Sequence, residues 1–166
     1  MRIAFGSDHA GFDLKGSLAT CAGEWGHEVV DLGTWGTDSV DYPDFGAAVG
    51  QAVASGSAEL GICVCGTGIG ISIAANKVHG VRAAVVHDVT SARLARQHNN
   101  ANVVCFGART TTFEVASESF EAFLAAEFQG GRHQRRIDKI TALENLPPTK
   151  ESKITALEDS PPAGES

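Results

Sequence analysis

The sequence predicts an α/β protein, a three-layer α/β/α Rossmann-like sandwich built around a five-stranded parallel sheet. Three observations support this fold class. Short apolar runs alternate with segments that have the periodicity of helices, a pattern typical of parallel sheets covered by helices on both faces. The run Leu60–Cys65 is almost entirely apolar, as expected for a strand buried on both faces. Glycines cluster near the ends of such runs, and all but one of the 19 glycines lie at or before Gly131.

The strands are predicted from short apolar and β-branched runs. The first follows the initiating methionine, the second begins after Gly26, and the third is the apolar run described above. The fourth and fifth are valine-rich runs separated by a polar segment. The five expected strands cover residues 2–5, 27–32, 60–65, 81–86 and 102–106.

The helices are predicted from apolar residues spaced three and four apart. In the first, residues 14, 18, 21, 22 and 25 form an apolar stripe, and Gly26 ends it. The second follows Asp41–Asp44, which is expected to be a turn. The six expected helices cover residues 12–25, 45–53, about 70–75, 90–97, 113–128 and 134–144.

Composition indicates one globular domain and a short tail. The 166 residues suffice for a core without metal or disulfide support, and the domain is expected to cover residues 1–146. Residues 147–166 are rich in Pro, Ser and Glu, which predicts a tail. This tail repeats the sequence Lys139–Glu144 as Lys153–Glu158, and we interpret the second copy as a duplicated helix end without a catalytic role.

The overall chemistry of the chain restricts its class. A formal net charge of −7 argues against a nucleic-acid-binding protein, although a local cationic cluster could still bind a small anion. No apolar run has the length of a membrane span, and the first residues lack the layout of a signal peptide. The four cysteines lie in apolar stretches, which is typical of reduced thiols and predicts a cytoplasmic protein.

Ligands of open parallel sheets bind where the strands end, at their carboxyl ends. The segments expected there are 6–11, 65–70, 87–88 and 107–109, and we place the polar run Arg96–Asn100 in the same group as a loop. In the first segment, Asp8 is either a functional acid or a helix N-cap.

The glycine loop, residues 66–70, is the strongest local signal. Its three glycines allow backbone N–H groups to converge at a helix N-terminus, which suits an anion or a developing oxyanion. No Gly-Lys-Ser/Thr follows, so it is not a Walker A loop. A dinucleotide site that uses Asp88 stays open, although Ile71 stands where Gly or Ala is expected. A purely structural tight turn is the other alternative.

Cys65 directly precedes this loop. A thiol next to a helix N-terminus ionises more readily than a free thiol, so Cys65 is the candidate reactive residue. We interpret Cys21, Cys63 and Cys105 as small core residues, while a redox pair of Cys63 with Cys65 remains an alternative. No second Cys/His cluster completes a metal site.

A cationic cluster occurs near the end of the predicted domain. Arg132 and Arg136 are four residues apart, so they share one helix face and could hold a phosphate between them. A solvated helix end is the simpler alternative.

Taken together, these segments resemble the type B ribose-5-phosphate isomerases, a family that includes the galactose-6-phosphate isomerase subunits. The resemblance covers residues 1–145 and leaves the tail outside. It is carried by five segments in order, residues 3–11, 41–44, 65–77, 96–102 and 130–136.

The resemblance implies an enzyme that interconverts ribose 5-phosphate and ribulose 5-phosphate through a cis-enediolate, in the non-oxidative branch of the pentose phosphate pathway. It implies that Cys65 is the base, since the glutamate that some members use a few residues later is replaced by Ile71. It also implies that the enediolate oxygens are held by the glycine loop, through Gly66, Thr67, Gly68, Ile69 and Gly70.

The remaining implied roles concern protons and the phosphate. Asp8 would handle protons on the sugar hydroxyls, and His98 would assist opening of the furanose ring. The implied substrate-binding residues are His9, Tyr42, Asn99, Arg109, Arg132 and Arg136, with Arg109 reaching in from a neighbouring subunit.

The resemblance further implies a homodimer or tetramer whose active site is shared between subunits, with no cofactor and no metal. Three alternatives remain. A six-carbon sugar phosphate, of allose or galactose, is a variant of the same reaction. A flavodoxin-like nucleotide-binding module and a thiol redox sensor are the others.

Overall fold

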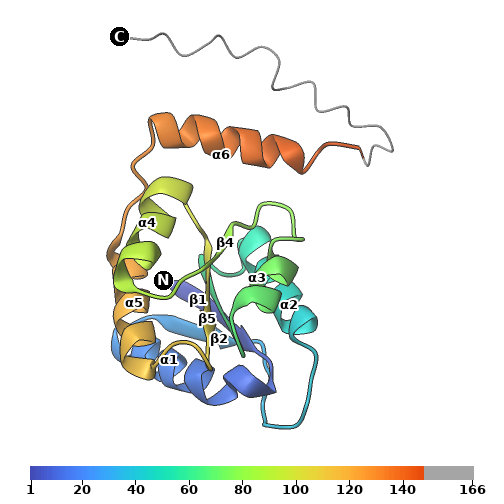
Figure 1. Ribbon diagram of the computed structural model, residues 1–166, viewed down its shortest axis with the longest axis vertical. Helices are drawn as coiled ribbons and strands as arrows, with labels where there is room; N and C mark the ends of the chain where they lie inside the picture. The colour runs from blue at the N-terminus through green and yellow to red at the C-terminus, as the bar shows by residue number, and fades with distance from the viewer. Residues whose placement is uncertain (148–166) are drawn as a thin grey trace.

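The computed structural model describes residues 1–147. The tail expected from residue 147, including the second copy of the repeated sequence, therefore lies outside the described residues apart from Pro147. Five parallel strands form one sheet in the order β2-β1-β3-β5-β4 (Figure 1). These strands are β1 (Arg2–Ser7), β2 (Glu28–Asp31), β3 (Leu60–Cys65), β4 (Ala83–Val85) and β5 (Val103–Gly107).

Helices cover both faces of the sheet, which confirms the predicted three-layer fold. On one face lie α1 (Phe12–Glu24), α4 (Val89–Asn99) and α5 (Phe113–Ala125), and on the other α2 (Tyr42–Ala54) and α3 (Ile69–Ala75) (Figure 1). The last helix, α6 (Arg132–Leu143), lies across one end of the molecule. No helix within residues 1–147 is long and apolar enough to span a membrane.

The parallel arrangement gives the sheet two chemically distinct edges. We call the ends of the strands, at residues 7, 31, 65, 85 and 107, the carboxyl edge, and their starts, at residues 2, 28, 60, 83 and 103, the amino edge. Because every helix between two parallel strands runs back along the sheet, its N-terminus lies at the carboxyl edge and its C-terminus at the amino edge.

The core consists of two apolar layers, one on each face of the sheet. Side chains alternate along β3, so that Ile62 and Val64 pack toward α1, α4 and α5, whereas Cys63 and Cys65 pack toward α2 and α3. Gly61 lies on the second face, and a Cβ there would come within 2.5 Å of the Val49 side chain. The missing side chain lets α2 approach the sheet closely, beside the start of β3.

The structure corrects two predicted boundaries near the site. Asp41–Asp44 is not a turn, because α2 begins at Tyr42, with a proline in its first turn that a helix start tolerates. His98 and Asn99 do not lie in a loop, because α4 continues to Asn99 before Asn100 ends it in the left-handed conformation. In both places, polar or proline-containing sequence led to a helix prediction that was too short.

Candidate active site

Cys65 is the last residue of β3 and only 4% exposed. Its Sγ accepts a hydrogen bond from the N–H of Gly68 at 3.2 Å, so the glycine loop directs a backbone donor at the sulfur. Gly68 has a φ of +77°, and a Cβ there would lie 3.0 Å from the backbone of Phe106. A glycine is therefore needed to bend the loop back over the sulfur.

The glycine loop has some of its N–H groups engaged and others free. Gly68 donates to Cys65, and the N–H of Ile69 donates to the Thr67 hydroxyl at 3.4 Å. Among the residues described, the N–H groups of Gly66 and Thr67 make no hydrogen bond. The Thr67 side chain is exposed. Of the predicted oxyanion donors, Gly66, Thr67 and Gly70 thus have N–H groups without a hydrogen-bond partner within residues 1–147, whereas those of Gly68 and Ile69 are engaged.

Asp8 lies next to Cys65 at the carboxyl edge. Its backbone N–H donates to the carbonyl of Val64 at 3.3 Å, one residue before Cys65. The carboxylate is 6% exposed and accepts a hydrogen bond from the N–H of Gly11 at 3.0 Å. Asp8 is therefore the N-cap of the short helical turn His9–Gly11, as its simpler interpretation predicted, and its buried carboxylate lies at the carboxyl edge, where Cys65 ends β3.

His9 lies at the same carboxyl edge, and Tyr42 and Arg109 contact the glycine loop itself. The Nδ1 of His9 lies 3.2 Å from the N–H of Val40, which fixes the imidazole against the segment before α2. The Tyr42 ring packs on Gly70, where a Cβ would come within 2.6 Å of Cζ.

Arg109 lies beside the glycine loop of its own chain. Its N–H donates to the Gly66 carbonyl at 2.9 Å, and a Cβ on Gly66 would lie 3.4 Å from its guanidinium Nη1. Arg109 contacts the glycine loop of its own chain because β5 ends next to β3. That Arg109 reaches the phosphate from a neighbouring subunit stays a prediction.

His98 and Asn99 lie at the opposite, amino edge. They form the last turn of α4, and the carbonyl of Asn100 accepts a hydrogen bond from Nε of Arg82, just before β4, at 3.0 Å. Placing Arg96–Asn100 at the carboxyl ends was wrong, because α4 runs antiparallel to the strands and ends where β5 begins. In a single chain, this segment cannot join Cys65.

The arginines of α6 belong to the amino edge as well. Residue His133 of α6 stacks on His98, with ring centroids 4.3 Å apart and an interplanar angle of 6°. Burial lowers the pKa of His133, and the neighbouring His98, Arg132 and Arg136 lower it further, so its neutral form is favoured. Arg132 and Arg136 themselves are exposed. The stack therefore fixes both cations near the His98 ring.

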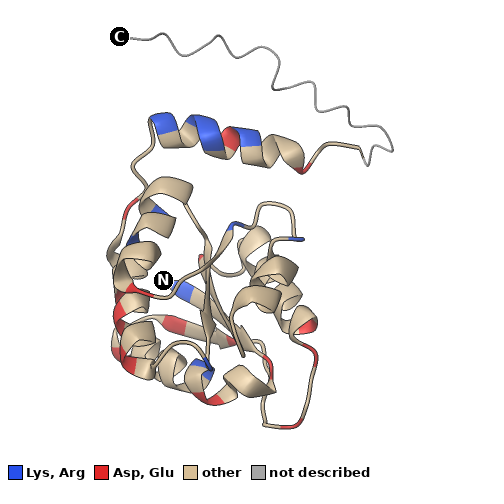
Figure 2. Cartoon of the chain, in the orientation of Figure 1, with Lys and Arg blue, Asp and Glu red and all other residues tan. Residues whose placement is uncertain are grey.

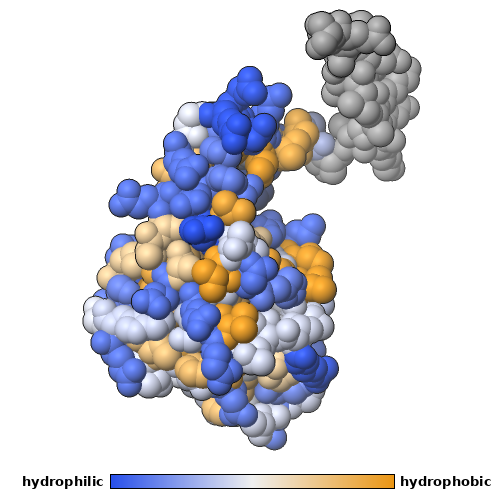
Figure 3. Space-filling view, turned by 60° about the vertical axis from the view of Figure 1, so that its left-hand side comes forward, coloured by the Kyte–Doolittle hydropathy of each residue, from blue (hydrophilic) through white to orange (hydrophobic). Residues whose placement is uncertain are grey.

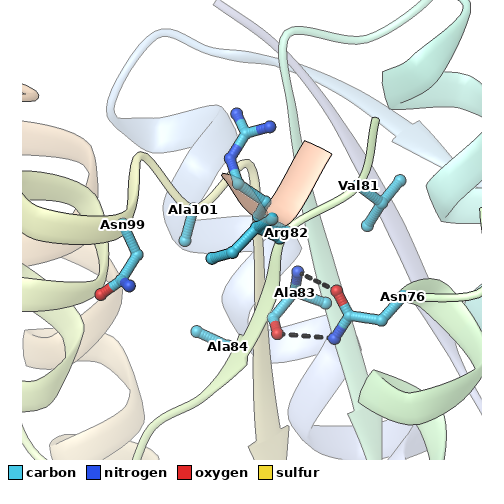
Figure 4. A pocket seen from close by; sticks show the side chains of 8 residues that line it. Asn76, Val81, Arg82, Ala83, Ala84, Asn99 and Ala101 are labelled. Carbon is cyan, nitrogen blue, oxygen red and sulfur yellow. Dashed lines mark hydrogen bonds between the residues drawn. The ribbon is translucent and has the colours of Figure 1, made fainter. Parts of the chain in front are cut away.

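Asn99 lines a cavity of about 260 Å³ at this edge (Figure 4). The other lining residues come from the segments before and within β4, from Asn76 after α3, from Ala101 before β5, and from Ile140 of α6. Asn76 holds the wall by two hydrogen bonds of 2.8 Å with the backbone of Ala83. Asn99 is exposed and free to contact a molecule that enters from outside the chain.

Two alternative sites receive a structural explanation. Asp88, the acid of the dinucleotide alternative, caps α4 by accepting the N–H of Ser91 at 2.7 Å, and this hydrogen bond lowers the pKa of Asp88. Cys105 is fully buried between its neighbours, and burial raises the pKa of its thiol, with Cys63 and Cys65 contributing further. Within residues 1–147, no three His, Cys, Asp or Glu side chains gather in a way that could bind a metal ion.

Sequence comparison decides the family. A family model described as ribose/galactose isomerase matches residues 3–140. The chain belongs to this family. Ribose-5-phosphate isomerase B of Escherichia coli (strain K12) is 50% identical over 143 residues, which are 86% of this chain and 96% of that protein.

Solved structures agree with this assignment. Ribose-5-phosphate isomerase B of Clostridium thermocellum superposes with a TM-score of 0.86 at 51% identity, covering 87% of this chain and 97% of the other. The Mycoplasma genitalium ribose-5-phosphate isomerase B, solved with bound ribulose-5-phosphate, has a TM-score of 0.83 at 46% identity and covers 86% and 95%. The resemblance on which the fold and the reaction were predicted is thus confirmed.

Two residues of the site region escaped sequence reasoning. His133 is buried one helical turn before Ile137, and this spacing along α6 is the signal that could have identified it. Lys15 of α1 is 1% exposed beneath the carboxyl edge. Nothing in the sequence marks it, because a lysine in an amphipathic helix is usually exposed.

Proposed function

We propose that this chain interconverts ribose 5-phosphate and ribulose 5-phosphate, the isomerisation of the non-oxidative branch of the pentose phosphate pathway. The observation that carries the proposal is Cys65, held below a glycine loop with free N–H groups, at the same edge of the sheet as the buried carboxylate of Asp8. The relatives named ribose-5-phosphate isomerase B support the choice of substrate, as does the bound ribulose-5-phosphate of the Mycoplasma genitalium structure.

Cys65 would act as the base in this reaction. The thiolate removes the proton from C2 of the aldose and returns it to C1, and the negative charge that develops moves to the carbonyl oxygen. The free N–H groups of Gly66 and Thr67 would receive that oxygen. In other enzymes one such donor contributes about 2.7–4 kcal/mol to the lowering of the barrier, so two converging amides are a substantial part of it.

Asp8 would move the hydroxyl protons, since it lies at the same edge of the sheet as Cys65 and its carboxylate retains acceptor capacity beyond its cap. Tyr42, packed on Gly70, would line the sugar, and Arg109 and His9 would bind the phosphate from the carboxyl edge. Phosphate binding at this distance from C1 and C2 supplies binding energy without touching the reacting atoms.

We also propose that the complete site forms between two copies of the chain. His98, Asn99, Arg132 and Arg136 carry the ring-opening and phosphate-binding chemistry, yet they lie at the edge opposite Cys65. A two-fold dimer brings the amino edge of one copy to the carboxyl edge of the other and makes two sites at once.

Apolar residues exposed in the single chain support this assembly. Ile69 and Ile73 of α3 are 54% and 56% exposed, next to the glycine loop. Leu143 at the end of α6 is 63% exposed. Figure 3 shows hydrophilic side chains over the first part of α6 and apolar ones toward its end. The proposed assembly is a homodimer, or a tetramer of such dimers, of a cytoplasmic enzyme whose isomerase domain spans residues 1–146.

Activity of a cysteine variant tests the catalytic proposal. Cys65→Ala is expected to lower kcat on ribose 5-phosphate by roughly 10²–10⁴-fold, the usual contribution of a general base. Cys21→Ala is the matched control, since Cys21 lies on α1 away from the loop. The assay contains EDTA. Full activity of a folded Cys65→Ala variant would contradict the proposal.

The six-carbon alternative rests on the galactose branch of the same family. Rates on ribose 5-phosphate, allose 6-phosphate and galactose 6-phosphate, measured side by side, decide between them. A kcat/KM that is higher for either hexose phosphate would replace the ribose assignment, and no turnover of all three by folded protein would refute isomerase activity.

A further inference from the structure

Lys15 is a charged residue buried beneath the carboxyl edge. Its side chain is 1% exposed, although α1 leaves other polar positions in solvent. Nζ donates to both carboxylate oxygens of Asp31, at 2.6 and 2.7 Å, and to the carbonyl of Thr34 at 2.8 Å. Each of the three ammonium protons therefore has an acceptor. The ammonium also lies 5.6 Å from the centroid of the Phe12 ring.

The two residues that accept from Lys15, Asp31 and Thr34, lie at the start of the segment from Asp31 to Val40, which we call the β2–α2 segment. Asp31 accepts a further hydrogen bond from the N–H of Gly33 at 2.9 Å, so one carboxylate holds both the lysine and the turn. After the end of β2, Gly33 and Thr34 continue the pairing with β1. Ser7 N–H donates to the Gly33 carbonyl and the Thr34 N–H donates to the Ser7 carbonyl, each at 2.7 Å.

The other end of this segment reaches the site at His9. Val40 donates its N–H to Nδ1 of His9, and its carbonyl lies 3.3 Å from the same nitrogen. The β2–α2 segment is thus attached on both sides of Asp8, at Ser7 before it and at His9 after it. Lys15 is the only side chain that we find tying the start of this segment, within residues 1–147, to the helix that follows His9.

Stability alone does not account for such an arrangement. A buried ammonium loses its hydration, and replacing a buried ion pair with apolar residues of similar volume is often neutral or stabilising. Asp31 keeps a 40% exposed side chain, so the pair is not sealed in the core. What the three hydrogen bonds do provide is a fixed geometry, because together they set the positions of Nζ, the Asp31 carboxylate and the Thr34 carbonyl relative to one another.

We propose that Lys15 is a positioning residue, which holds the β2–α2 segment through Asp31 and Thr34 and thereby fixes the Asp8 carboxylate and the His9 imidazole for the reaction. The inference rests on the proposed function, since it assigns Lys15 a part in the same site. Lys15 does not touch the substrate. It acts through Ser7 and Val40, whose hydrogen bonds flank the two site residues.

The decisive variant is Lys15→Met, which keeps the length of the side chain and removes its charge. We expect a folded protein with a kcat lowered about 10- to 100-fold, because displacements near 1 Å in an active site have effects of this size. KM should rise as well, since His9 is assigned to the phosphate. Asp31→Asn keeps the shape of the side chain but removes its charge, and it should likewise lower kcat and raise KM.

The matched control is Arg2→Met. Arg2 of β1 forms an ion pair with Glu28 of β2 at 3.2 Å, at the amino edge, and both side chains are at least half exposed. Removing that charge should leave kcat and KM unchanged. The double variant Lys15→Met/Asp31→Asn should be no worse than Lys15→Met alone, because both changes remove one interaction.

A spectroscopic measurement separates positioning from general destabilisation. The ring ¹⁵N and ¹³C signals of His9 report its contact with Val40, and they should shift in Lys15→Met while those of His27 stay in place. A folded Lys15→Met protein with kcat and KM within twofold of the unsubstituted chain, or with an unchanged His9 spectrum, would overturn the inference.

The two proposals fail in different ways. If the unsubstituted chain does not isomerise ribose 5-phosphate, the proposed function fails, and the His9 spectrum still decides whether Lys15 fixes the site. If the unsubstituted chain is active and Cys65→Ala is inactive, a Lys15→Met variant with unchanged kcat, KM and His9 spectrum refutes only the role of Lys15 and leaves the proposed function in place. Should Lys15→Met fail to fold, the partly exposed Asp31→Asn supplies the same readouts.

Discussion

Mixing two inactive variants tests whether the active site is shared. Cys65 lies at the carboxyl edge and His98 at the amino edge of one chain, so a shared site takes one residue from each copy. Cys65→Ala and His98→Asn should each inactivate a homodimer, because both of its sites are incomplete. A hybrid dimer should be different. One of its sites lacks both residues, and the other contains both.

The expected recovery follows from counting. Random association of equal amounts gives half of the dimers as hybrids, and one of the two sites in each hybrid is intact. The mixture should therefore reach about 25% of the activity of the unsubstituted protein, and purified hybrids about 50%. If each chain contained its own complete site, hybrids would have no intact site and the activity would not recover.

The assay needs two affinity tags and one further mixture. Cys65→Ala and His98→Asn chains with different tags are co-expressed, purified over both columns, and assayed on ribose 5-phosphate. Cys65→Ala mixed with Asp8→Asn is the control, since both residues lie at the same edge and no hybrid site is complete. Purified Cys65→Ala/His98→Asn hybrids as inactive as this control would refute the shared site.

Two further predictions concern α6. Arg136→Ala should mainly raise KM, by roughly 10-fold or more, because a charge-assisted phosphate contact serves ground and transition state alike; Arg135→Ala on the neighbouring face is the control, and a loss of kcat alone would contradict the assignment. In the folded chain the pKa of His133 is lowered from the usual histidine value of 6.5, so below that pH the unfolded chain binds more protons than the folded chain. The folded chain should therefore be most stable above pH 6.5 and lose stability as the pH falls below it. Thermal unfolding of the unsubstituted chain and of His133→Gln between pH 5 and 8 measures this, and the variant should lose most of the slope.

The sheet was predictable because burial leaves a clear mark on its strands. Leu60–Cys65 was predicted to the residue, since a strand covered on both faces must be apolar throughout. β4 at the edge of the sheet is shorter than the predicted run 81–86. Its regular pairing with β5 covers Ala83–Val85, Val86 adds one hydrogen bond to the carbonyl of Cys105 at 3.1 Å, and the N–H of Val81 donates to Val78 instead. Periodicity detects burial, and it does not detect hydrogen-bond pairing.

The candidate site was predictable only in part, for a topological reason. Asp8 and the residues from Cys65 to Gly70 follow strands directly, so the rule for parallel sheets places them correctly. Arg96–Asn100 precedes a strand rather than following one, so the same rule, once the direction of the strands is taken into account, assigns this segment to the amino edge. Lys15 could not be found at all. Its partners lie on β2 and beyond, and only the folded chain brings them together.

The division of the site also explains how an acidic chain could bind a phosphate. The whole chain has a net charge of −7, yet in the part that Figure 2 colours the acidic side chains are spread over the strands and helices before α6, whereas Lys and Arg concentrate along α6. In one chain, Arg109 at the carboxyl edge is separated from Arg132 and Arg136 by the length of the sheet. Pairing two copies would bring these groups together at each site, so the substrate phosphate should stabilise the dimer and the dimer should bind phosphate more tightly, by the same factor. A dimer dissociation constant that inorganic phosphate leaves unchanged would show that the two edges do not share the anion.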